Sequence, residues 1–302
     1  MTSRRDFIKQ TAQSSAFIGL AGNPLSFTNE DHKHITILHT NDVHSHLEAF
    51  KASHPSYANR GGIANRLATI NQIKQENPNT LVFDAGDLFQ NEPFFNFYDN
   101  KLEIQAMNKL AYDASTLGTH DFSMGLDALG KQIDQANFEV LIANYSFKNK
   151  SLSNKIKPYS IYIKDGIRIG VFGLGIALDK HQNSSLTNEI ECQDPIAVAQ
   201  KISAKLRHQE QCDLVICLSH LGYQYRDNQI SDLVLAEKTQ DINLIIGGRT
   251  HTFLDRPTIL KNKIGKSVLV NQVGWAGLYL GRIDFYINTN KEISYSGKAI
   301  PL

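Results

Sequence analysis

Apolar stretches of strand type alternate with stretches of helical periodicity along most of the chain. The first strand-like stretch, "ITILHT", covers residues 35–40, and it is followed by Ile63, Leu67, Ile70 and Ile73 at helical spacing. Strands joined through helices pair in parallel, because the helical crossover returns the chain to the same edge of the sheet. The alternation therefore predicts an α/β fold, with parallel sheets that carry helices on their faces.

This alternation continues to about residue 251 and has one interruption. Asp165-Gly166 stands between two alternating apolar runs, which predicts a tight hairpin. Asp194 followed by Pro195 predicts a capped helix start. The tail, 266–290, is expected to form consecutive antiparallel strands. Further strands are expected within 79–87, 114–121, 138–145, 212–220 and 242–251, and helices within 61–77, 100–113, 124–136, 194–210 and 229–239.

The N-terminus differs in character from the rest of the chain. "SRRDFIK" precedes a short, mildly apolar stretch, and the pair Arg4-Arg5 resembles a twin-arginine export signal. The alternative is a disordered basic tail. Residues 1–28 are therefore predicted to be an export signal for the periplasm or cell envelope, ahead of one domain over 29–302. No run of about 18 apolar residues occurs, so a transmembrane helix is not expected.

Charge and cysteine content exclude several classes of protein. The chain carries 31 basic and 30 acidic residues, which gives no electrostatic basis for binding nucleic acid. The three cysteines, Cys192, Cys212 and Cys217, are odd in number and form no CxxC pair. They are expected to be small buried side chains, and neither a disulfide framework nor a thiolate metal site is expected.

Acidic residues and histidines come directly after five of the predicted strands. In open α/β sheets, ligands bind outside the carboxyl ends of the strands, so these side chains are expected to meet. A mixed set of carboxylates and imidazoles suits zinc, manganese or iron better than calcium. The pattern predicts a divalent metal site. Its members are Asp42 and His44, Asp84 and Asp87, His120 and Asp121, His220, and His251.

The segments around these residues form an ordered series of motifs. "HTNDVHSHLE", "DAGDLF", "GTHDFSMG", "LSHLG" and "GGRTHT" resemble the motifs of the calcineurin-like metallophosphoesterases, above all the N-terminal catalytic domain of the 5′-nucleotidases. The resemblance covers about residues 34–290. It implies a four-layer α/β/β/α sandwich with two metals that share one aspartate. It also implies hydrolysis of phosphoric esters, in which a metal-activated water attacks phosphorus.

The resemblance also implies roles for individual residues. His120 would stabilise the charge that develops on the phosphate, and Asp121 would orient the imidazole of His120. Asp84 is expected to be structural, and His46 to lie behind the ligands or at the surface. The first metal would be bound by Asp42, His44, Asp87 and His251, with Asp87 as the shared aspartate and His220 as a ligand of the second metal.

Two positions depart from the family pattern, and both belong to the second metal. Thr119 stands where the family has asparagine, and Arg249 stands where it has histidine. A threonine hydroxyl is a poor substitute for an amide carbonyl, and a guanidinium has no lone pair to offer and repels a cation. We therefore expect one tightly bound ion and a weak or empty second site. Arg249 and His120 are expected to bind the substrate phosphate instead.

The length of the chain limits what the resemblance implies about the substrate. The nucleotidases of this family carry a C-terminal domain that holds the nucleoside, and no such domain follows in this sequence, which ends at Leu302. A phosphorylated small molecule is the expected substrate. If it is a nucleotide, a separate chain is expected to supply that domain. Two alternatives stay open: a degenerate member that binds one metal and a ligand or partner with little turnover, and a metal-binding α/β protein of unrelated chemistry.

Overall fold

The structure is a computed structural model, and it describes residues 32–89, 101–148, 150–178, 188–227 and 229–302. Beyond His32, the described part of the chain forms one compact unit, Lys33–Leu302. The predicted export signal, residues 1–28, lies outside the described residues. Within the described residues, no helix has the length and apolar character needed to cross a membrane.

Seven strands form the first sheet, in the order β15-β14-β1-β2-β3-β4-β6. The strands β1, β2, β3, β4 and β6 pair in parallel, whereas β14 and β15 form an antiparallel pair. The parallel part confirms the expected strand–helix alternation. The strands are β1 (His32–Thr40), β2 (Thr80–Asp84), β3 (Ala114–Ser115), β4 (Glu139–Leu141), β6 (Ile156–Lys157), β14 (Tyr279–Asn288) and β15 (Ile293–Pro301).

The second sheet has six strands in the order β12-β13-β11-β10-β8-β7. Its four inner strands are parallel, and both edge strands are antiparallel to their neighbours. The predicted hairpin joins β7 to β8, where Asp165 (φ 49°) and Gly166 (φ 73°) adopt the left-handed backbone that a tight hairpin turn requires. The strands are β7 (Tyr159–Lys164), β8 (Ile167–Gly175), β10 (Leu214–His220), β11 (Leu244–Gly247), β12 (Thr258–Lys261) and β13 (Ser267–Asn271), and a separate pair is formed by β5 (Tyr145–Phe147) and β9 (Ile190–Cys192).

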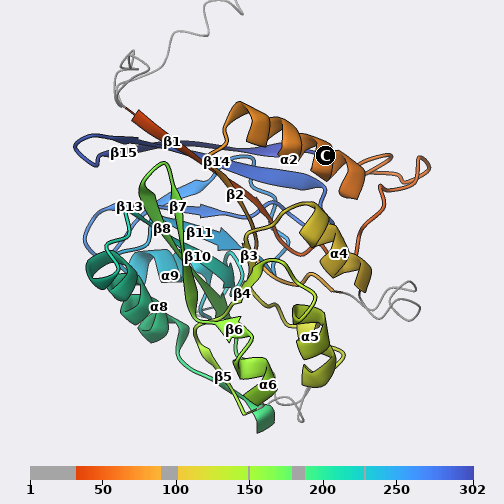
Figure 1. Ribbon diagram of the computed structural model, residues 1–302, viewed down its shortest axis with the longest axis horizontal. Helices are drawn as coiled ribbons and strands as arrows, with labels where there is room; N and C mark the ends of the chain where they lie inside the picture. Colours follow the sequence, from red (N-terminus) through yellow and green to blue (C-terminus); the bar gives the residue numbers. More distant parts are fainter. Residues whose placement is uncertain (1–31, 90–100, 149, 179–187, 228) are drawn as a thin grey trace, which may run out of the picture. The chain divides into compact units, whose positions relative to one another are not determined.

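Helices cover the outer faces of the two sheets (Figure 1). The predicted cap at Asp194 is confirmed, because its carboxylate accepts a hydrogen bond from the backbone N–H of Ala197 at the start of α8. Ser123 does not cap α5, because that helix begins after Gly125. The helices are α2 (Ile63–Glu76), α4 (Lys101–Lys109), η1 (His120–Phe122), α5 (Leu126–Ile133), α6 (Lys150–Ser153), α8 (Pro195–Ala204) with the π-helical turn η2 (Lys205–Gln209), and α9 (Asp232–Lys238).

Alternation along the strands builds three apolar layers between these elements. Leu81 and Phe83 of β2 and Ile216 of β10 lie in the core between the two sheets. Val82 points the other way, into a core with α2, α4 and α5, and Cys217 points into a core with α8 and α9. The order of layers is therefore helices, sheet, sheet, helices. This confirms the four-layer α/β/β/α sandwich.

The tail of the chain differs from its prediction. Its strands were expected to be consecutive and antiparallel, but β13 lies beside β11 in the second sheet and is parallel to it. The antiparallel partner of β13 is β12, which precedes it, whereas β14 pairs antiparallel with β15 in the first sheet. The apolar pattern of this segment identifies strands correctly, but it contains no information on which partner each strand finds.

His39 links the two sheets, as a packed polar side chain rather than a site residue. Its Nε2 lies 2.8 Å from Nδ2 of Asn271 on β13, and the imidazole is fully buried. Burial lowers the pKa of His39 to about 3, so the ring is neutral at physiological pH. His39 therefore has a packing and hydrogen-bonding role between the two sheets.

Candidate metal centre

Five of the predicted ligands gather at the carboxyl ends of the strands. Within the described residues, two overlapping groups could hold a metal ion, and in each group the ligand atoms lie within 4.8 Å of one another. The first group is Asp42, His44 and His251, and the second is Asp42, Asp87 and His220. Asp42 belongs to both groups, whereas the prediction placed Asp87 in the shared position. The individual ligand roles stay predictions.

The first group brings two imidazoles together. Nε2 of His44 and Nε2 of His251 are 3.0 Å apart, and Oδ1 of Asp42 lies 3.4 Å from the latter and 3.9 Å from the former. Burial lowers the pKa of His44, Asp87 and Asp42 raise it, and His251 lowers it further. Two ring nitrogens that face each other beside a carboxylate form an arrangement that a cation would stabilise.

The second group contains the clearest indication of a metal ligand. His220 is completely buried, and its Nδ1 lies 2.7 Å from the carbonyl oxygen of Ala85, which can only accept. Nε2 therefore faces the site, 3.0 Å from Oδ2 of Asp87 and 3.9 Å from Oδ1 of Asp42. A histidine with one nitrogen fixed by a carbonyl and the other directed at carboxylates fits a divalent cation.

Charge in this group favours a cation as well. Burial lowers the pKa of His220, but Asp87 and Asp42 outweigh this effect and raise the pKa to about 10. Burial alone would raise the pKa of Asp87, but His220, His120 and His44 hold it below its usual range. In the protein without metal, a proton thus compensates the carboxylates. A cation would compete with that proton and release it on binding.

The loops that carry these residues have unusual backbone conformations. Asp42, His44, Asp87 and His251 have φ angles of 49°, 49°, 55° and 50°, which lie in the left-handed region that side chains other than glycine rarely adopt. Hydrogen bonds between loops hold these conformations: the Asp42 N–H donates to the carbonyl of Gly86, and the His44 N–H to that of Asp87. Such clusters of strain are typical of functional sites, and the sequence patterns did not reveal them.

Asp121 fixes the loop that carries Asp87. Its Oδ2 accepts from the N–H groups of Gly118 (2.8 Å) and Asp87 (3.0 Å), and its Oδ1 accepts from that of Phe89 (3.1 Å). Burial and the nearby Asp87 raise the pKa of Asp121 to about 7. The prediction was that Asp121 orients His120, and this stays a prediction. The exposed His120 ring lies at the rim, edge-on to His44 at 5.2 Å.

Arg249 and Thr119 meet, although 130 positions separate them. Nη1 of Arg249 lies 3.4 Å from Oγ1 of Thr119, and the Arg249 N–H donates to both oxygens of Asp42, at 2.9 and 3.0 Å. Burial raises the pKa of Tyr225, and the positive charge of Arg249 partly opposes this effect. The Arg249 backbone thus contacts Asp42, which both candidate groups share, while its guanidinium extends toward Thr119.

Two buried amides position the ligand loops, and the sequence analysis missed both. Asn41 donates to Oδ2 of Asp42 at 2.7 Å and to the carbonyl of Gly274 at 2.6 Å. Gln272 accepts from the Thr252 N–H and donates to the carbonyl of Gly248, and so supports both ends of the loop that carries Arg249 and His251. In the sequence, the only sign of their role is that each is a polar residue directly after an apolar strand, Asn41 after β1 and Gln272 after β13.

Known proteins are similar to this chain in sequence and fold. The calcineurin-like phosphoesterase family matches residues 35–253. A 5′-nucleotidase of Vibrio parahaemolyticus is 29% identical over 98% of this chain and 56% of its own length. The trifunctional nucleotide phosphoesterase YfkN of Bacillus subtilis is 30% identical over 83% of this chain and 18% of its own.

A solved structure has a similar fold and a sequence identity close to that of these relatives. The 5′-nucleotidase precursor of Thermus thermophilus superimposes with a TM-score of 0.81 and 31% identity, over 89% of this chain and 55% of that one. The chain therefore spans about half the length of this protein and of the Vibrio relative.

Proposed function

Because the chain belongs to the calcineurin-like phosphoesterase family, we propose that it is a metal-dependent phosphoric-ester hydrolase of the 5′-nucleotidase type. The observation that carries this proposal is the buried His220, whose Nε2 lies 3.0 Å from Oδ2 of Asp87 and 3.9 Å from Oδ1 of Asp42. A buried imidazole nitrogen beside two carboxylates is the donor set that a divalent cation prefers.

Asp42, His44, Asp87 and His251 are proposed to hold one tightly bound ion, of the zinc, manganese or iron type. When bound, such an ion supplies Lewis acidity, which polarises a phosphoryl oxygen and acidifies water. His220 is the remaining ligand on the side of the second site. With Arg249 beside it, we propose that this second site is weak or empty.

Arg249 is proposed to bind the substrate phosphate in place of the second ion. A guanidinium presents parallel N–H donors that match two phosphate oxygens, and Arg249 is anchored by its own N–H to Asp42. His120, at the exposed rim, would donate to the oxygen on which charge develops. Asp121 would keep the Asp87 loop in position while this happens.

The substrate class is proposed from the names of the relatives, which act on nucleotides. This chain matches only part of the length of those relatives. We propose that a separate polypeptide supplies the counterpart of the unmatched part and completes the site for the nucleoside. The antiparallel pair β14–β15 is the proposed docking surface for that polypeptide.

Assays of the purified protein test these proposals. A size-exclusion-purified monomer is expected to hydrolyse p-nitrophenyl phosphate with added manganese, cobalt or zinc, to lose this activity in chelator, and to bind one metal per chain. No turnover with any metal would select the degenerate alternative. Two tightly bound metals would overturn the proposed weak second site. A monomer that hydrolyses nucleotides as fast as the aryl phosphate would contradict the need for a partner chain.

Export is proposed from Arg4 and Arg5, together with Phe7, Ile8 and Lys9. In a bacterial host with a twin-arginine pathway, the full chain is expected in the periplasmic fraction. Replacing Arg4 and Arg5 together with lysine should move it to the cytoplasmic fraction, because the paired arginines are what the pathway recognises. An unchanged distribution would show that residues 1–28 do not act as this signal.

A further inference from the structure

Aromatic side chains from two loops form a continuous wall beside the candidate metal centre. We use "aromatic wall" for His46, Phe50, Tyr57 and Trp275. The ring of Trp275 lies 5.3 Å from that of His46 and 6.2 Å from that of Phe50, and Phe50 lies 5.5 Å from Tyr57. At its inner end, the Trp275 ring is parallel to the His251 ring, with an interplanar angle of 8° and a centroid distance of 5.9 Å.

Backbone hydrogen bonds fix Trp275 relative to the ligands. The N–H of Ala276 donates to the carbonyl oxygen of Asp42 at 2.8 Å, and Asn41 bonds to Gly274 and to the N–H of Val273 on the other side of Trp275. The backbone on both sides of Trp275 is therefore held by the loop that carries Asp42.

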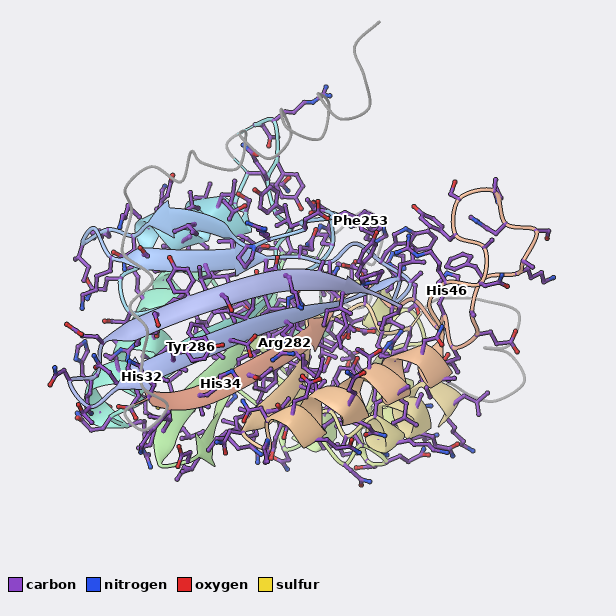
Figure 2. All side chains as sticks on the ribbon, turned by 90° about the horizontal axis from the view of Figure 1, so that it is seen from above. His32, His34, His46, Phe253, Arg282 and Tyr286 are labelled. Carbon is purple, nitrogen blue, oxygen red and sulfur yellow. The ribbon has the colours of Figure 1, made fainter. Side chains whose placement is uncertain are left out.

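The wall faces solvent and continues outward into a hollow. All four of its side chains are half-buried, and 40% of the His251 side chain is exposed. Tyr57 also lines a cavity of about 170 Å³ together with Phe253 and Tyr279. Figure 2 shows His46 and Phe253 at the same end of the molecule, whereas Tyr286 and His34 lie toward the opposite end.

We propose that the aromatic wall binds the planar aromatic ring of the substrate's leaving group, a nucleobase, by stacking on Trp275. The inference rests on the proposed hydrolase function and adds a ligand-binding surface to it. A phosphate held at Arg249 and the metal centre carries its leaving group toward the exposed rim, where Trp275 borders His251. Aromatic side chains stack on every base, because each base has a π-face. The chain itself thus supplies one contact to the base, to which a partner chain would add others.

Trp275 is the single tryptophan of the chain, so stacking on it can be observed directly. The unmodified protein is titrated in chelator, where no turnover occurs, with adenosine 5′-monophosphate and with glycerol phosphate as a ring-free control. Adenosine monophosphate is expected to quench the tryptophan fluorescence saturably, and glycerol phosphate is not. Equal responses to the two compounds would overturn the proposal.

Variant kinetics provide the second readout. Trp275→Ala is expected to raise the ratio of KM for adenosine monophosphate to KM for glycerol phosphate about tenfold, and Trp275→Phe is expected to restore most of it. Tyr286→Ala, which removes a half-buried ring at the opposite end, is the matched control and should leave the ratio unchanged. An unchanged ratio in Trp275→Ala would contradict the proposed base stacking on Trp275 but not the proposed hydrolase function. Fluorescence quenching by adenosine monophosphate, without turnover in the presence of metal, would contradict the proposed hydrolase function but support base stacking on Trp275.

Discussion

Asp42→Asn is expected to lower phosphatase activity at least about 100-fold and to abolish tight metal binding. Replacement of residues behind a metal ligand already costs about 10- to 100-fold in metal affinity or activity, so a ligand shared by both groups should cost more. The fold should survive, because asparagine has nearly the same shape as aspartate.

The reason lies in the position of Asp42 between the imidazoles. Its Oδ1 lies 3.4 Å from Nε2 of His251 and 3.9 Å from Nε2 of both His44 and His220, so one carboxylate faces three nitrogen ligands. Both carboxylate oxygens also accept the Arg249 N–H. An asparagine keeps one acceptor oxygen for that bond but removes the negative charge that a divalent ion needs.

A second aspartate serves as the control for Asp42→Asn. Asp113 also accepts a backbone hydrogen bond, from Val82 at 2.8 Å, but it belongs to neither candidate metal group. Asp113→Asn is expected to keep its metal and its activity within about threefold, since it changes no ligand. Metal content per chain, initial rates and thermal unfolding in chelator distinguish the two variants. If Asp42→Asn retained a tenth of the activity, Asp42 would not lie at the catalytic metal.

The sequence contained enough information to predict the layered fold and most of the centre. Strands and helices differ in apolar periodicity, and parallel strands deliver their carboxyl ends to the same edge. That is why Asp42, Asp87, His220 and His251, spread over more than 200 positions, could be expected to meet and do meet. Arg249 and Thr119 were expected together because the family resemblance assigns both positions to the second metal, and Nη1 of Arg249 lies 3.4 Å from Oγ1 of Thr119.

Contacts that depend on strand pairing or on loop closure could not be predicted. The partner of β13 is decided by burial in the second sheet, which no local pattern records. No local pattern distinguishes Trp275 from a core aromatic of a strand, whereas the turn between Gly274 and Gly277 presents it beside His251. Asn41 and Gln272 likewise act on residues far away in the sequence. Their importance becomes visible only when the loops are in place.

Thr119→Asn combined with Arg249→His is expected to create a second metal site and to raise activity about tenfold or more. In the unmodified chain the second group keeps Asp87 and His220, and we propose that the Arg249 guanidinium, whose Nη1 lies 3.4 Å from Oγ1 of Thr119, takes the place of a further ligand. The double variant exchanges a positive charge for a neutral imidazole and a hydroxyl for an amide carbonyl. Two ions then share the charge that one ion and an arginine shared before.

The single variants separate the two contributions of Arg249. Arg249→Ala removes the positive charge without adding a ligand, so it should lower kcat about 100-fold if the guanidinium stabilises the phosphate in the transition state. Arg249→His alone adds a ligand but leaves Thr119 in place, so its metal content should lie between one and two ions per chain. The N–H of residue 249 still donates to Asp42 in every variant, because the backbone is unchanged.

The number of metal ions per chain is measured for the unmodified protein, the double variant, Arg249→Ala and Arg249→His. These counts show whether Arg249 replaces the second ion or only lies beside its site. A rise from one to two ions with higher activity in the double variant means that the guanidinium occupies the place of the cation. Two ions already in the unmodified chain would mean that Arg249 leaves the second site intact, and Arg249→Ala should then cost little. Higher metal content without higher activity would mean that the phosphate depends on Arg249 itself, since the second ion would have displaced the group that binds it.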